Sequence, residues 1–184
     1  MLRIYRLRDV IRIDPSKFGM DIEKVALEEL KNRYESKWVK DLGLIILVRN
    51  PKVDPEGHII FGDGASYHYV EFEAVAFVPI INEIVEGIVT NVTNMGMSVR
   101  IGPIEGFVHR SQVSDEEVVF DPMRKAMVCK QSKKFVTSGD IVRARITSVA
   151  TSGRHGTIRI NLTMRQPFLG KLSWVEEYIK SRQR

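Results

Sequence analysis

The sequence of 184 residues lacks several features that would place it in common classes of protein. A single cysteine, Cys129, excludes an internal disulfide and any metal site built from several thiolates. No apolar run approaches the roughly 18 residues that a membrane span requires. The N-terminal stretch MLRIYRLRDVIRID also lacks the uninterrupted apolar core of a signal peptide. We therefore expect a cytoplasmic protein with no membrane segment, no disulfide and no bound metal.

The sequence also lacks the residue patterns of the common catalytic centres. No Ser-His-Asp or Cys-His arrangement can be proposed from spacing, and the histidines are scattered along the chain. The acidic run at 115–117 has no second cluster to complement it, so we expect these carboxylates to face solvent. The stretch FGDGAS is not followed by the lysine and helix of a phosphate-binding loop. It instead predicts a tight turn with positive φ at Gly62 or Gly64. We expect no enzymatic activity and no cofactor.

Positive charge is concentrated in one half of the chain. Residues 1–80 carry 12 Lys and Arg against 13 Asp and Glu, whereas residues 81–184 carry 16 against 10. Within residues 122–165 ten basic residues accompany one acidic residue. A field of one sign over a compact module favours a polyanionic partner, and nucleic acid is the leading candidate.

The first half of the sequence predicts a small α/β domain over residues 1–80. An extended segment at 2–13 is followed by Asp21, which is suited to cap the amphipathic helix predicted over 22–36. Three further strands are predicted at 43–50, 58–63 and 67–78. The last of these alternates cleanly, so that Val70, Phe72, Ala74, Ala76 and Val78 share one face.

After Pro79 the sequence becomes a series of short strands separated by Gly, Asn and Pro. Such a series is typical of a small β-barrel. The five predicted strands lie at 83–92, 96–102, 104–110, 140–149 and 156–163. A long loop is predicted at 114–138 and a C-terminal helix from near Ser173, which completes a second domain over 81–184. The fold class is therefore α+β.

Alternation along the barrel strands predicts an outward face rich in cations. On the second strand Met97, Val99 and Ile101 point to the core, which leaves Ser98 and Arg100 outward. Single-stranded nucleic acid needs cations for its phosphates and flat side chains for its bases. The candidate face consists of Ser98, Arg100, Phe107, His109, Arg143, Arg145, Arg159 and Asn161. The lysines of KQSKKF in the long loop, Lys130, Lys133 and Lys134, are either a phosphate-binding strip or a solvated loop, with equal weight.

The motifs of the second half resemble those of a known RNA-binding fold. The stretches GIVTNVTNMGMSVRIGPIEGFVHRSQV, SGDIVRARITSV and IRINLTMRQP are similar to the S-one-type domain, a five-stranded OB-fold barrel. The whole chain resembles the archaeal RNA polymerase stalk subunits called E-prime, a family that includes the seventh subunit of eukaryotic polymerase II. The stretches FGDGASYHYVEF, GPIEGFVH, GDIVRARI and TMRQPFLGKLSWVEE carry this resemblance, and TMRQP followed by LGKL is its most specific part.

The resemblance implies a noncatalytic protein whose RNP-like N-terminal domain docks on the polymerase core near the clamp. The glycine turn at the tip of that domain, Gly62, Asp63 and Gly64, is the implied docking element. The barrel is implied to contact emerging single-stranded RNA in initiation and elongation. A small, mostly helical partner subunit is implied to pack along both domains and form a heterodimer.

This sequence departs from the family pattern in one place. The general S-one-type domain reads Phe-Gly-x-Phe-Val where this chain has Met95-Gly96-Met97-Ser98-Val99, so that both stacking rings are absent. Each base stacked on an aromatic ring contributes about 1–3 kcal/mol to the free energy of binding. Met95 can still lie against a base as a soft apolar surface, and His109 matches the family's histidine. We expect a weak, sequence-tolerant and salt-sensitive RNA binder.

Two other functions compete with the polymerase interpretation. A free-standing RNA-binding factor of translation or RNA decay would explain the barrel but not the first domain or TMRQPFLGKL. A ribonuclease would need paired carboxylates or a metal cluster, which the sequence does not indicate.

Overall fold

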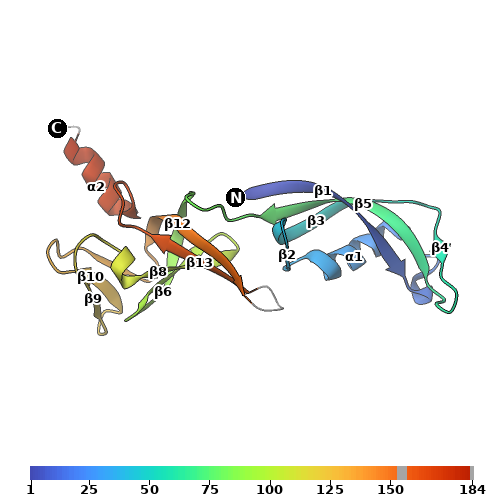
Figure 1. Cartoon of the computed structure of the whole chain (residues 1–184), viewed down its shortest axis with the longest axis horizontal. Coiled ribbons are helices and arrows are strands. Elements are labelled where there is room, and N and C mark those ends of the chain that lie inside the picture. The colour runs from blue at the N-terminus through green and yellow to red at the C-terminus, as the bar shows by residue number, and fades with distance from the viewer. Residues whose placement is uncertain (153–156, 183–184) are drawn as a thin grey trace. The chain divides into compact units, whose positions relative to one another are not determined.

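The computed structural model describes residues 1–152 and 157–182. The chain separates after Val78 into two compact units, Met1–Val78 and Pro79–Arg184 (Figure 1). Each unit consists mainly of strands and contains one α-helix in its described part, α1 (Ile22–Tyr34) in the first and α2 (Leu172–Arg182) in the second. The α+β class predicted from the sequence is confirmed.

The first unit is an antiparallel sheet with α1 packed on one face. Its strands lie in the order β1-β5-β3-β2, and β4 pairs with β5. The elements are β1 (Leu2–Ile13), the short 3-10 helix η1 (Pro15–Lys17), β2 (Trp38–Val39), β3 (Gly43–Val53), β4 (His58–Ile59) and β5 (Ser66–Phe77). The strand predicted at 58–63 is wrong beyond Ile59, because the chain turns there and the Asp63 N–H donates to the Ile60 carbonyl.

Helix α1 begins where its capping residue predicts. The Asp21 side chain accepts a hydrogen bond from the Glu23 N–H at 3.1 Å, which satisfies one of the free donors of the first turn. The buried side chains of the helix, Val25, Ala26 and Leu30, lie on the face turned toward the sheet.

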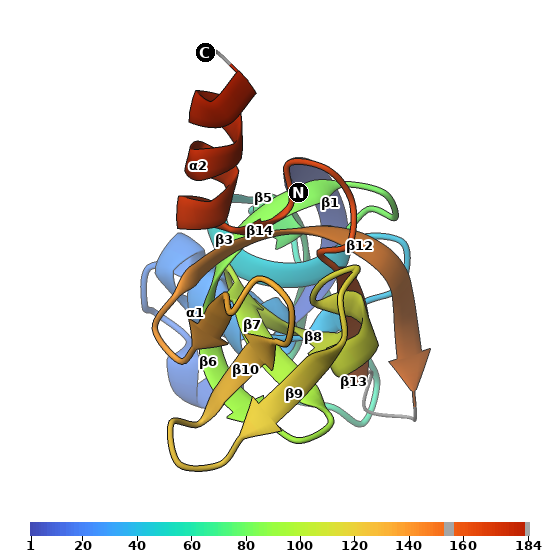
Figure 2. The ribbon, with the colours of Figure 1, turned by 90° about the vertical axis from the view of Figure 1, so that its left-hand side faces the viewer.

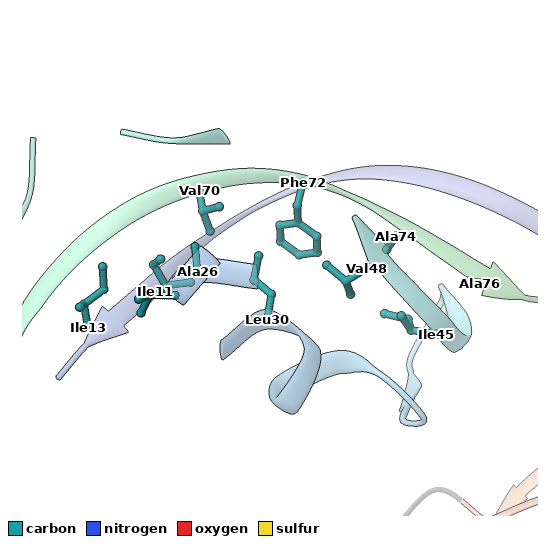
Figure 3. Close-up of a cluster of buried hydrophobic side chains, with 11 residues drawn as sticks. Ile11, Ile13, Ala26, Leu30, Ile45, Val48, Val70, Phe72, Ala74 and Ala76 are labelled. Atoms are coloured by element: carbon teal, nitrogen blue, oxygen red, sulfur yellow. The ribbon is translucent and has the colours of Figure 1, made fainter. Parts of the chain in front are cut away.

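The core of the first unit lies between α1 and the sheet. Leu30 of the helix packs with Ile11, Val48 and Phe72 of the strands (Figure 3). The predicted inward face of β5 is confirmed for Val70, Phe72, Ala74 and Ala76, all of which are buried. Burial of one large side chain such as Phe72 stabilises the folded state by about 1.5–3 kcal/mol.

The second unit is a closed five-stranded barrel, as predicted. Its strands follow the order β13-β8-β7-β6-β12, and pairing of β12 with β13 closes the sheet. The bounds are β6 (Ile84–Thr93), β7 (Gly96–Ile101), β8 (Ile104–His109), β12 (Ile141–Ser152) and β13 (Thr157–Thr163). A 3-10 helix η2 (Arg110–Gln112) follows β8, and β14 (Gly170–Lys171) adds to β12 before α2 begins.

The segment predicted as a long loop over 114–138 instead forms a small antiparallel sheet, which we call the insert. Its strands are β9 (Val118–Asp121), β10 (Ala126–Cys129) and β11 (Phe135–Thr137), in the order β11-β10-β9 (Figure 2). Ala126, Met127, Cys129 and Val136 are buried. The prediction failed because each strand is only three or four residues long, too short to show a period in the sequence.

Helix α2 begins at Leu172, one residue before the predicted start. Among the described residues, no helix is long and apolar enough to cross a membrane.

Candidate nucleic-acid interface

The register of the barrel strands brings five polar or aromatic residues into one row, which we call the polar row. Asn91 pairs with Ser98, Ser98 with Phe107, Phe107 with Asn161, and Asn161 with Ser148. Directly paired residues point to the same face of a sheet. The row therefore runs over the outside of the barrel from β6 across β7, β8 and β13 to β12.

The inward side of the same strands confirms the predicted alternation. Met97, Val99 and Ile101 are buried in the barrel. Ser98 and Arg100 consequently face outward, and the Arg100 side chain is 64% exposed, with Glu105 Oε1 at 3.9 Å. An exposed ion pair at this distance contributes little, so the guanidinium stays available to another anion.

Phe107 is the ring of the polar row, and a glycine positions it. A Cβ atom at position 96 would lie 2.6 Å from Phe107 Cζ and 2.3 Å from the Val108 carbonyl oxygen. The absence of a side chain on Gly96 thus lets the ring lie against β7. Phe107 is half-buried and keeps part of its ring open to solvent.

His109 ends β8 and is held in a defined orientation by the turn that follows. The Ser111 N–H donates to His109 Nδ1 at 3.3 Å, and the Ser111 Oγ lies 2.9 Å from the same nitrogen. Because Nδ1 accepts a hydrogen bond, the neutral imidazole carries its proton on Nε2. His109 is exposed, so that Nε2–H can donate to a base, a ribose hydroxyl or a phosphate.

A shallow depression of about 520 Å³ lies beside these two residues. Phe107, His109, Thr147 and Asn161 line it. Asn161 Nδ2 donates to Ser148 Oγ at 2.9 Å, which fixes the carboxamide at the rim. Thr147 and Ser148 were absent from the sequence-based site, because they join it only through the pairing of β12 with β13.

The three predicted arginines of β12 and β13 lie in different surroundings. Arg159 is exposed and shares the outward parity of Asn161. Arg143 donates from Nε and Nη2 to Glu86 Oε1 at 2.9 and 2.8 Å. Arg145 pairs with Ile84 and Thr163 and is only partly exposed. The register therefore places Arg143 and Arg145 outside the polar row.

The three predicted lysines lie at the β10–β11 turn of the insert and are not members of the polar row. Lys130 Nζ lies 2.6 Å from Glu117 Oε1, and Lys134 Nζ lies 3.4 Å from Glu177 Oε2. Lys133 has φ of +57° and its side chain is exposed.

The acidic run at 115–117 faces solvent at two of its three positions, as the sequence predicted, since the side chains of Asp115 and Glu117 are 75% and 69% exposed. All three carboxylates also have partners. Asp115 Oδ1 accepts from Arg165 Nε at 3.0 Å, and Glu117 is bound by Lys130. Glu116 Oε2 accepts the N–H groups of Gln131 and Ser132, and the Ser132 hydrogen bond lowers the pKa of this carboxyl. Glu116 and Glu117 therefore link the segment before β9 to the β10–β11 turn. Within residues 1–152 and 157–182, no group of three acidic, His or Cys side chains is arranged to hold a metal.

The glycine turn of the first unit is braced by its aspartate. Gly62 has φ of +87°, which confirms the predicted turn. Asp63 accepts from Arg12 Nε and Nη2 at 2.9 and 2.8 Å and from the Tyr67 hydroxyl at 2.7 Å. The Arg12 hydrogen bond, followed by that of Tyr67, holds the pKa of the Asp63 carboxyl well below its ordinary range. Gly64 beside it is exposed.

Next to this turn lies an exposed apolar segment that sequence analysis treated as strand, Ile59-Ile60-Phe61, which we call the apolar tip. Ile59 is 74% exposed and Phe61 is fully exposed. Large apolar side chains that gather on a surface mark interaction sites. Three consecutive apolar residues before a glycine turn are the signal that could have identified the tip.

Two family descriptions match the two units. "S1 RNA binding domain" matches residues 78–155, and "SHS2 domain found in N terminus of Rpb7p/Rpc25p/MJ0397" matches residues 8–64. Both agree with the barrel and with the sheet and helix of the first unit.

Relatives extend the match over nearly the whole chain. DNA-directed RNA polymerase subunit Rpo7 of Saccharolobus shibatae is 44% identical over 177 residues, 96% of this chain and 98% of the relative. The Sulfolobus acidocaldarius Rpo7 is 43% identical over 180 residues, 97% of each chain. DNA-directed RNA polymerase II subunit rpb7 of Schizosaccharomyces pombe is 29% identical over 164 residues, 88% of this chain and 94% of the relative. With this identity carried from end to end across both units, the chain belongs to the Rpo7 family of DNA-directed RNA polymerase subunits.

Proposed function

We propose that this polymerase subunit acts in the cytoplasm as a noncatalytic part of the stalk, which docks on the polymerase core and contacts emerging single-stranded RNA. One observation carries the RNA contact: the depression beside Phe107 and His109 combines a partly open ring with an imidazole N–H donor. Arg100 and Arg159 add cations on the same outward parity. This combination is what a single strand needs for its bases and phosphates.

We expect RNA binding to be weak, because the polar row contains one aromatic ring. A second stacked base would add about 1–3 kcal/mol, and neither Met95 nor Ser98 can supply a ring for it. Met95 is 69% exposed and offers only an apolar surface. Affinity should therefore come largely from phosphate contacts, which are insensitive to sequence and sensitive to salt.

The apolar tip supports docking of the first unit on the polymerase core near the clamp. Phe61 and Ile59 extend into solvent, while Asp63 and Arg12 brace the turn behind them. A rigid turn that presents apolar side chains loses little conformational freedom on binding. Gly62 and Gly64 belong to this docking element because they allow the turn.

The heterodimer with a small helical partner is the third part of the proposal. The face of the first sheet opposite α1 exposes apolar side chains, among them Leu2, Ile4 and Leu47. Surfaces of this kind favour a protein partner. We assign no catalytic step to the subunit, and the purified protein should not cleave RNA when a divalent metal is added.

Affinity capture of the chain from its native cells at moderate salt tests the polymerase assignment. We expect the large polymerase subunits together with one small partner in near-equal amount. Recovery of ribosomal or RNA-decay components in their place would overturn the assignment.

A double variant, Arg100→Ala with His109→Ala, tests the RNA face within the same assembly. It should weaken RNA binding and leave recovery of the polymerase unchanged, because both side chains are exposed on the barrel. Arg124→Ala, an exposed arginine of the insert, is the matched control. Loss of polymerase with RNA binding retained would mean that this face serves a protein partner.

A further inference from the structure

A second, larger cleft adjoins the depression on the polar row. It has a volume of about 650 Å³, and Asn94, Arg110, Val119 and Phe120 lie among its lining residues. Strand β9 of the insert lies beside η2 here, as Figure 2 also shows. Ser111 lines both the depression and the cleft. The two hollows therefore border the same serine.

Arg110 lines this cleft and forms no ion pair with another described residue. Its backbone N–H donates to the Met95 carbonyl at 3.0 Å, which anchors it at the edge of the barrel. Lys130 and Arg165 also line the cleft, but they are bound to Glu117 and Asp115. Within the part of the chain that the structure describes, no acidic side chain lies within ion-pair distance of Arg110.

The carboxylates of the cleft are already satisfied. Asp115 forms an ion pair with Arg165 and Glu117 forms one with Lys130. Glu116 accepts hydrogen bonds from two backbone N–H groups of the insert. Hydrogen bonds and opposite charges of this kind offset a carboxylate's repulsion of a phosphate. Three cations and three acids line the cleft, and Arg110 is the cation among them with no described acid at ion-pair distance. Guanidinium groups bind phosphate in bidentate fashion.

Phe120 lines the same cleft as Arg110 with an aromatic ring. It lies on β9, where it pairs with the fully buried Met127 of β10, and its own side chain is partly exposed. The ring is thus held by a packed neighbour while one part of it borders the cleft. A base stacks on any such ring without regard to sequence.

We propose that single-stranded RNA bound in the depression continues across Ser111 into this cleft, where Arg110 binds a phosphate and Phe120 stacks a base. The proposal rests on the RNA binding proposed above and extends it from the barrel onto the insert. It also assigns a stacking ring to a protein that lacks rings at positions 95 and 98.

Binding of fluorescent oligouridine to the full chain tests this second subsite. Single OB folds cover about 4 to 16 nucleotides, so one probe has about 4 nucleotides and the other about 12. Affinities are measured at several salt concentrations for the wild type, Arg110→Gln, Phe120→Leu and the control Arg124→Gln. Arg124 is exposed on the same insert but does not line the cleft.

Loss of one phosphate contact lowers the slope of log affinity against log salt by about 0.7 for a single strand. We expect Arg110→Gln to lower the salt slope by this amount with the long probe and to leave the slope unchanged with the short probe. We expect Phe120→Leu to weaken the long probe about 5- to 150-fold, the factor for one stacked base. Arg124→Gln should behave as the wild type with both probes.

An unchanged salt slope for Arg110→Gln with the long probe would overturn the second subsite. If the Arg100→Ala, His109→Ala variant still shows reduced RNA affinity in that case, RNA binding on the barrel is supported and only the proposed subsite in the cleft is refuted. A wild type that binds neither probe would refute RNA binding itself. If Phe120→Leu lowers the melting temperature, its effect on RNA binding is not used. Arg110→Gln, a substitution at an exposed position, then decides by itself whether the cleft is a second RNA subsite.

Discussion

The ring of Phe107 lies against Gly96 of the neighbouring strand, close enough that a Cβ at position 96 would come within 2.6 Å of its Cζ. The pair links the fold to the site, because the same glycine that permits close packing of β7 and β8 also positions the ring that is proposed to stack on RNA.

Gly96→Ala should therefore destabilise the barrel and weaken RNA binding together. The added methyl would also meet the Val108 carbonyl oxygen at 2.3 Å, and backbone cannot move as a side chain can. Overpacking of this kind costs about 1–3 kcal/mol. Urea unfolding measures this loss. Gly64→Ala is the control, since its Cβ would meet only Pro15 Cγ at 3.6 Å; equal stability of the two variants would refute the packing argument.

Phe61→Ser should abolish docking without affecting stability. The ring is fully exposed, and surface substitutions usually change the free energy of unfolding by no more than about 0.5 kcal/mol. Recovery of the polymerase in affinity capture should fall while the melting temperature stays the same. Met123→Ser, at a residue 95% exposed in the second unit, should leave recovery unchanged. Full recovery with Phe61→Ser would exclude the apolar tip from the interface.

Asp63→Asn should destabilise the first unit in a pH-dependent way. The folded state lowers the pKa of Asp63, so the stabilisation is present above the ordinary carboxyl pKa of about 4 and is lost as the pH falls through the lower folded value. The difference in urea midpoint between wild type and variant should be largest near pH 7 and shrink toward pH 3. Asp41→Asn, at an exposed aspartate, is the control. A difference independent of pH would show that the Arg12 contact acts without the charge.

Leu30→Ala should destabilise the first unit by about 2–5 kcal/mol, the usual cost of truncating a fully buried leucine. Leu30 packs between α1 and the sheet, so the cavity would lie at the centre of this core (Figure 3). Circular dichroism during denaturation would follow the loss. Ile59→Ala, at an exposed position, should cost little; a similar cost for both would contradict the assigned core.

Much of the fold and part of the site could be predicted from local patterns. Alternation along β7 identified Met97, Val99 and Ile101 as core and Ser98 and Arg100 as surface. Asp21 marked the start of α1 because a cap acts on the next few N–H groups. Both signals depend on residues that are neighbours in the sequence.

The insert and the partners of its charges could not be predicted in this way. Strands of three or four residues have no readable period, and they form because Met127 and Val136 find a buried position. The sequence likewise could not show that Glu116 would bind amides 15 and 16 residues away, or that Arg143 would be bound by Glu86.

The sequence by itself determined the family, the two-part organisation of the chain and the inward or outward direction of most strand residues, because motifs, breaks and periodicity are local properties. Only the tertiary structure decided that Phe107 would stand beside Asn161 and that Ser111 would border both the depression and a cleft. It also decided that no acid of the described residues would lie within ion-pair distance of Arg110. These relationships depend on strand register and on contacts between distant segments. Closure of the barrel sets the register, and packing of β9 beside η2 brings the insert to the barrel.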